Sequence, residues 1–180
     1  SDQTHQAVIR PTMKKLTLAT LLIFSCASAW GADFDKGVFA YQSGNYKAAL
    51  AEWRPLAQGG SARAQNFLGF MYDNGEGVLE DDLEAVKWYR LAAEQGSAKA
   101  QYGLGVMFAN GEGVAQSNVY AHMWWNISAA NGDGKARENK AIIASQMTAQ
   151  ELASAKTLAS ACVRKSYKNC YKRRSSTKTK

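Results

Sequence analysis

The sequence has few of the residues on which catalysis and metal binding depend. Its 180 residues include two histidines and three cysteines, and none of these lie together at the spacing of a metal site. His122 lies beside apolar residues in a helical stretch, so we interpret it as an ordinary helix residue. The serines show no triad signature. We therefore expect no catalytic residue, no metal ligand and no cofactor, and a protein that is not an enzyme.

Prolines and long apolar runs are also scarce. There are only two prolines, Pro11 and Pro55, which favours helices joined by glycine turns. The mostly apolar run at residues 16–24 has nine residues, well short of the roughly 20 that a membrane-spanning helix needs. We expect an all-α protein without a membrane span.

The early part of the chain is typical of a signal peptide. Lys14 and Lys15 precede the apolar run, and a small-x-small cleavage pattern follows at residues 27–29. We predict a signal peptide at residues 13–32 and, upstream of it, a non-native or mis-started leader at residues 1–12. The protein should then be periplasmic or secreted.

A lipoprotein anchor at Cys26 is a less favoured alternative. Ser25 and Cys26 resemble a lipoprotein box, but Phe24 is bulky where a small or medium residue is usual. If the signal peptide is removed conventionally, Cys26 leaves with it. Cys162 and Cys170 then remain, in a compartment that permits disulfides, and we predict a bond between them.

Acidic residues are absent after Glu151, whereas eight basic residues lie between Arg164 and the C-terminus. Without these eight, the chain is nearly neutral. A basic terminal run is more often a solvated extension than a nucleic-acid surface, so we interpret residues 164–180 as a basic disordered tail. We expect no nucleic-acid partner, although the tail could bind an anionic envelope polymer.

An internal repeat with a period of 36 residues is the strongest feature of the sequence. Ala64, Leu68 and Gly69 recur as Ala100, Leu104 and Gly105, and the pentapeptide NGEGV at residues 74–78 recurs at residues 110–114. Tryptophans also recur in phase, which indicates core packing. Apolar residues within each unit follow helical spacing, and Gly69 and Gly105 fall inside helices, where a close helix crossing would explain them.

The glycine-rich pentapeptide predicts a turn and not a ligand site. A phosphate-binding loop would need a preceding strand and usually a lysine, and here a helix precedes the motif and a glutamate lies inside it. Alternating strands, which an Asn-Gly hairpin requires, are also missing. We predict that the loop glycines provide positive φ between antiparallel helices; they are Gly75, Gly77, Gly111 and Gly113.

A unit that reads A-x-x-x-L-G-x-x-Y/F, N-G-x-G-V and A-x-x-W-Y/W-x-x-A-A-x-x-G resembles the Sel-1-like repeat, a relative of the tetratricopeptide repeat. The resemblance covers residues 34–133 and implies a right-handed α-solenoid of antiparallel helix pairs with a C-terminal capping helix. We divide this part of the chain into a tetratricopeptide-like first repeat (33–61), two Sel-1-like repeats (62–97 and 98–133) and capping helices (134–163).

The resemblance also implies an adaptor that binds other proteins. Side chains that vary between units, off the shared core face, should line the concave surface of stacked helices. We predict that Asn66, Phe70, Tyr102 and Val106 bind the partner. The protein would be a monomeric interaction scaffold of the bacterial envelope or secreted space. Cysteine-rich exported relatives imply an alternative, a weakly β-lactamase-like protein that binds β-lactams or cell-wall fragments, but their recurrent cysteine pairs are missing here.

Overall fold

A computed structural model describes residues 31–171, and within this range the chain forms eight α-helices and no β-strand. The helices are α1 (Phe34–Gln42), α2 (Tyr46–Gln58), α3 (Ala62–Asn74), α4 (Asp82–Ala93), α5 (Ala98–Asn110), α6 (Asn118–Ala130), α7 (Gly134–Ala144) and α8 (Ala149–Arg164). The predicted leader, Cys26 and all but the last two residues of the predicted signal peptide lie outside the described residues, as does the tail from residue 172.

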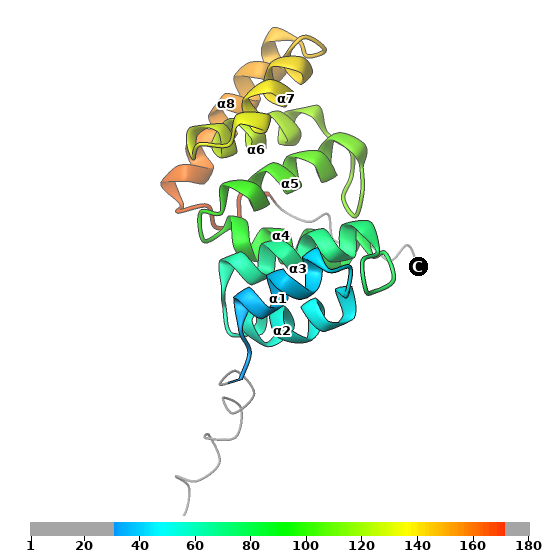
Figure 1. Ribbon diagram of the computed structural model, residues 1–180. Helices are drawn as coiled ribbons and strands as arrows, with labels where there is room; N and C mark the ends of the chain where they lie inside the picture. The colour runs from blue at the N-terminus through cyan, green and yellow to red at the C-terminus, as the bar shows by residue number, and fades with distance from the viewer. Residues whose placement is uncertain (1–30, 172–180) are drawn as a thin grey trace, which may run out of the picture.

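The helices stack as successive hairpins along one axis, from α1 and α2 at one end to α7 and α8 at the other (Figure 1). α1 packs with α2, α3 with α4, and α5 with α6, and each second helix also packs on the first helix of the next pair. This is the all-α solenoid that the resemblance to the Sel-1-like repeat implied.

A glycine of the first helix faces an aromatic ring of the second helix inside each pair. The rings belong to residues spaced 36 apart, namely Trp53, Tyr89 and Trp125, and they face Gly37, Gly69 and Gly105. A Cβ atom at Gly69 would lie 2.6 Å from Cδ1 of Tyr89, and one at Gly37 or Gly105 would overlap the indole ring. The prediction that Gly69 and Gly105 mark close helix crossings is therefore confirmed.

Hydrogen bonds fix the two tryptophan rings against the first helices. Nε1 of Trp53 donates to the carbonyl of Phe34 at 3.1 Å, and Nε1 of Trp125 donates to the carbonyl of Tyr102 at 3.2 Å. In both pairs the accepting residue precedes the facing glycine by three positions. The indole N–H groups of Trp53 and Trp125 are thus satisfied in the same way in two different pairs.

Each NGEGV loop connects the two helices of one pair, α3 to α4 or α5 to α6, and its second glycine contacts the preceding pair. Gly75 and Gly111 follow α3 and α5 with φ angles of 67° and 83°, a left-handed conformation that suits glycine. Gly77 and Gly113 also have positive φ, 74° and 63°. A Cβ atom at Gly77 would lie 2.9 Å from the carbonyl carbon of Tyr46, at the start of α2, and Gly113 lies in the same way against the start of α4.

A buried glutamine also links each pair to the next. Nε2 of Gln65 donates to the carbonyl of Ala57 at 3.0 Å, and Oε1 of Gln65 accepts from Nε2 of Gln95 at 2.7 Å. Gln101 repeats both bonds one unit later, at 3.2 and 2.8 Å. Because both ends of the buried amide are satisfied, the bonds hold the ends of α2 and α4 in register.

The last helix, α8, packs mainly on α6. α8 begins with a capping box, in which the Thr148 hydroxyl and the Glu151 carboxylate each accept a hydrogen bond from the other residue's backbone N–H. It then packs along α6 instead of forming a tightly packed hairpin with α7. α6 therefore packs against three other helices, α5, α7 and α8.

The predicted disulfide between Cys162 and Cys170 is confirmed. It returns the chain after α8 to the helices, so that the ring of Tyr171 packs on three aromatic rings. Its centroid lies 4.9, 6.3 and 6.5 Å from those of Phe108, Tyr120 and Trp124. The prediction of a disordered tail from residue 164 was therefore wrong for residues 164–171, because α8, the disulfide and these contacts order them.

Replacing a glycine that faces a ring should destabilise the protein. In Gly105→Ala, the added methyl group overlaps the indole of Trp125, so we expect a loss of about 1–3 kcal/mol in the free energy of unfolding, although alanine is the better helix former. Urea denaturation measures the change.

Gly134→Ala is the matched control, since Gly134 begins α7 and a Cβ atom there would meet nothing within 4 Å. It should be neutral or mildly stabilising. If Gly105→Ala were as stable as the control, the close crossing would not require glycine.

Candidate partner-binding faces

One side of the solenoid is formed by the first helices of the pairs, α1, α3, α5 and α7. α3 packs on α5 and α5 on α7 along this side, whereas α2, α4 and α6 do not pack on one another to the same extent. The array therefore curves toward the first helices. We call their exposed side the inner face, and the exposed side of the second helices the outer face.

The four predicted partner-binding residues lie on the inner face. Phe70 of α3 is 40% exposed, and its ring lies edge-on to that of Tyr41 with the centroids 6.5 Å apart. Asn66, one turn earlier, is half-buried. Tyr102 and Val106 of α5 are half-buried and pack partly on the core. Phe70 is thus the most accessible of the four.

Tyr102 is held more firmly than the sequence indicated. Its hydroxyl oxygen accepts a hydrogen bond from Nδ2 of Asn139 at 3.3 Å, and its ring centroid lies 6.5 Å from that of Trp125. A side chain fixed in this way loses little conformational freedom on binding a partner.

Phe70 and Val106 belong to a longer apolar row that the sequence analysis missed. Val38 of α1 and Ile142 of α7 occupy the equivalent positions, so each first helix contributes one apolar side chain. Ile142 is 60% exposed. The signal for Ile142 was present, because it follows Val106 by 36 residues; Val38 is out of phase because the first unit is shorter.

Polar rows flank this apolar row at helical spacing. On one side lie exposed basic residues, 36 apart in α3, α5 and α7: Arg63, Lys99 and Lys135. On the other side lie exposed amides at or just beyond the ends of the four helices: Gln42, Asn74, Asn110 and Gln146. The guanidinium of Arg63 lies 3.8 Å above the Phe34 ring, which keeps it along the inner surface.

His122 has little capacity for chemistry. Its ring is buried in α6, and Nδ1 has no hydrogen-bond partner within the described residues. Burial lowers the pKa of His122, and Lys140 and Lys156 lower it further, so the ring is neutral at pH 7. Within residues 31–171, no three His, Cys, Asp or Glu side chains are placed to hold a metal ion. No helix in the same range is long and apolar enough to cross a membrane.

A small acidic group lies near the end of α3. Burial raises the pKa of Asp73, and the nearby carboxylates of Glu112, Asp82 and Glu80 raise it further. The Tyr89 hydroxyl, which donates to Oδ2 of Asp73 at 3.2 Å, acts in the opposite direction. The ionised form of Asp73 is therefore held at a net cost.

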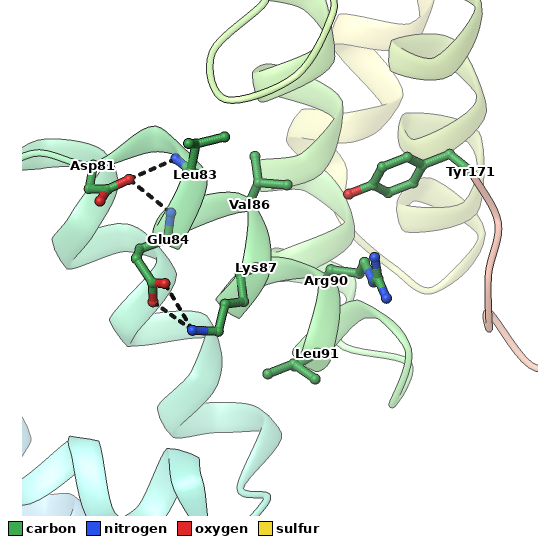
Figure 2. Close-up of a pocket in the computed structure, with 8 residues that line it drawn as sticks. All are labelled: Asp81, Leu83, Glu84, Val86, Lys87, Arg90, Leu91 and Tyr171. Atoms are coloured by element: carbon green, nitrogen blue, oxygen red, sulfur yellow. Dashed lines mark hydrogen bonds and ion pairs between the residues drawn. The ribbon is translucent and has the colours of Figure 1, made fainter. Parts of the chain in front are cut away.

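A hollow with a volume of about 420 Å³ opens on the outer face beside α4 (Figure 2). Leu83, Val86 and Leu91 of α4 provide apolar walls, and Tyr171 forms the opposite side. This hollow could not be predicted from the sequence, because it forms between α4 and a segment that lies about 80 residues later in the chain.

Comparisons with known proteins agree with this architecture. Residues 62–97 and residues 98–133 each match the Sel1 repeat family. The fold is similar to that of a protective antigen of uropathogenic Escherichia coli strains, which displays an SLR fold, with a TM-score of 0.69 and 28% identity over 87% of this chain. It is also similar to a Sel1 repeat protein from Oxalobacter formigenes, with a TM-score of 0.57 and 32% identity over 60% of this chain.

The chain covers only 34% and 44% of those two proteins. No curated protein sequence matches it.

The cost of ionising Asp73 should appear in the pH dependence of stability. Because its pKa is raised on folding, the cost is fully present above that raised pKa and absent below the ordinary aspartate value near 4. Asp73→Asn keeps an acceptor for the Tyr89 hydroxyl. It should therefore stabilise the protein at pH 7, by less than about 1 kcal/mol because the site is partly solvated.

Urea denaturation at pH 7 and pH 4 tests this expectation, and the advantage of Asp73→Asn should shrink at the lower pH. Glu138→Gln, at an exposed carboxylate of α7, serves as the control and should change little. An advantage of Asp73→Asn that grows on acidification would contradict the assignment.

Proposed function

Because the chain is a Sel1-like repeat protein, we propose that it is a scaffold that binds another protein along its inner face. Sel1 repeats are in general scaffolds for protein–protein interaction and not catalytic units. The observation that carries the proposal is the apolar row, in which each of four successive first helices places one side chain on the inner face. Phe70 and Ile142 are exposed, and Val38 and Val106 are half-buried.

The spacing of the row indicates the form of the partner. Packed helix axes lie about 8–10 Å apart. An extended segment in the polyproline II conformation has three residues per turn and rises about 3.1 Å per residue, so every third side chain lies on one face at about the same spacing. A partner segment that crosses the first helices would therefore place one side chain on each helix with every third residue. An extended segment with an apolar residue at every third position fits this face.

The flanking rows add polarity to that segment. Arg63, Lys99 and Lys135 along one edge favour acidic residues on the corresponding side of the partner. The amides along the other edge can donate to and accept from a peptide backbone. Phe70, Tyr102, Val106 and Asn66 then contact the central part of the segment, and Phe70 and Ile142 are its most exposed apolar anchors.

Selection from a displayed library of random peptides tests this function. We expect the full chain to enrich acidic peptides with apolar residues three apart. The double variant Phe70→Ala/Ile142→Ala should weaken their binding at least tenfold, since two exposed anchors are lost, as measured by fluorescence anisotropy.

Phe39→Ala is the matched control, because Phe39 is 74% exposed but lies outside the apolar row, at the α1 position equivalent to the buried Met71 of α3. It should keep full affinity. Equal binding of the selected peptides to the double variant would refute the inner-face assignment.

The place of action that fits this chain is the bacterial envelope or the secreted space. The Cys162–Cys170 disulfide supports export, since such bonds persist in oxidising compartments. The basic residues that follow Cys170 would attach the protein to an anionic envelope polymer.

Cell fractionation with thiol labelling tests the location and the attachment together. The protein should appear outside the cytoplasm with both cysteines protected from labelling, and a variant truncated after Tyr171 should elute from the envelope at lower salt. Reduced cysteines in a cytoplasmic fraction would contradict export, and an unchanged elution would contradict attachment through the tail.

A further inference from the structure

The outer face of α6 is covered by a helix, α8, whereas no helix within the described residues covers the outer face of α4. α8 packs along α6 and leaves Met123 and Ile127 of α6 0% and 2% exposed. α8 itself contributes small side chains, Ala155, Ala159 and Cys162, which are 0%, 2% and 1% exposed. Small residues on one helix let the two helix axes approach closely.

The equivalent positions in α4, 36 residues earlier, are uncovered. Leu83, Lys87 and Leu91 correspond to Val119, Met123 and Ile127 of α6. Leu83 is 55% exposed, Leu91 is 38% exposed, and the side chain of Lys87 is 55% exposed. α4 thus presents to solvent two register positions, those of Lys87 and Leu91, whose equivalents in α6 are buried, whereas Val119 is half-buried.

The uncovered face of α4 also forms one side of the hollow described above. Leu83, Val86 and Leu91 line the hollow of about 420 Å³, and the ring of Tyr171 stands opposite them (Figure 2). The packing of Tyr171 on Phe108, with centroids 4.9 Å apart, holds this wall in place. The hollow therefore adjoins the surface where the C-terminal segment packs on α5 and α6.

The two basic residues that line the hollow, Lys87 and Arg90, are each paired with a glutamate, and the carboxylate of Asp81 accepts hydrogen bonds from the backbone N–H groups of Leu83 and Glu84. Nζ of Lys87 lies 2.8 Å from Oε1 of Glu84, and Nε of Arg90 lies 3.2 Å from Oε1 of Glu94. A partner does not have to neutralise these charges, so its contact surface can be apolar. The leucine positions span eight residues, about 12 Å along the helix, which matches two to three turns of a second helix.

We propose that the outer face of α4 binds an amphipathic helix of a partner protein, with small residues at i, i+4 and i+7 as in α8. A second copy of this chain is a poorer occupant, because the alanine face of its α8 is already covered by its own α6. The protein then has two binding faces, an inner face for an extended segment and an outer face for a helix.

The probe is a synthetic peptide of residues 147–164 with Cys162→Ala, stapled on its polar face so that it is helical before binding. Fluorescence anisotropy with the full chain should show saturable binding. Leu83→Asp/Leu91→Asp should weaken it at least tenfold, because both changes put a carboxylate into the apolar contact. Both residues are exposed, and circular dichroism checks that the variant is folded.

Ile142→Asp is the matched control, an exposed apolar residue of the inner face, and it should leave peptide binding unchanged. A photo-reactive group on the peptide should cross-link to α4. The proposal fails if no saturable binding is seen at about 1 mM peptide, if the leucine variant binds equally well, or if cross-links form on α6 by displacement of α8.

The sedimentation coefficient of the chain without peptide shows whether a second copy of the chain occupies the outer face of α4 instead. It should be the same for the wild type and for Leu83→Asp/Leu91→Asp. A dimer that only the wild type forms would overturn the proposal in favour of a second copy. Because the inner-face variants leave α4 intact, this result is independent of the proposed inner-face function.

Discussion

The contact between a glycine and an aromatic ring sets the distance between the two helices of each pair. Gly37, Gly69 and Gly105 let a large ring lie directly on the backbone of the first helix, and the two indoles then reach a backbone carbonyl of that helix. Because the spacing is the same in three pairs, the first helices come into line and their exposed residues form rows. The inner face is thus a product of core packing, although none of its residues is in the core.

Much of this fold could be predicted because neighbouring units have the same residues at equivalent helix and turn positions. The period, the glycine turns, the close crossings and the capping box of α8 are all local patterns. The position of α8 could not be predicted in this way. Ile127 and Leu91 are similarly apolar, and the one clear difference is that Met123 is apolar where Lys87 is charged. That single difference does not identify the helix that α8 covers, because the covering is a contact between distant segments.

The candidate faces divide along the same line. Phe70 and Val106 could be placed on a common face because the period relates them, and Ile142 was within reach of the same argument. The hollow beside α4 was not, because Tyr171 reaches it only after the disulfide has turned the chain back. Sequence periodicity therefore indicates surfaces that repeat, whereas surfaces that arise where the repeat stops require coordinates.

The contacts between neighbouring helix pairs have a consequence for how such a chain can change in length. Gly77 lies on the start of α2 and Gly113 on the start of α4, and Gln65 and Gln101 repeat one set of bonds. The contacts between the first and second pairs and between the second and third pairs therefore use equivalent surfaces. A whole unit of 36 residues can be duplicated or lost with both new boundaries already matched. The insertion of one residue in a loop has no such match. Evolution of this chain should therefore proceed in steps of complete units.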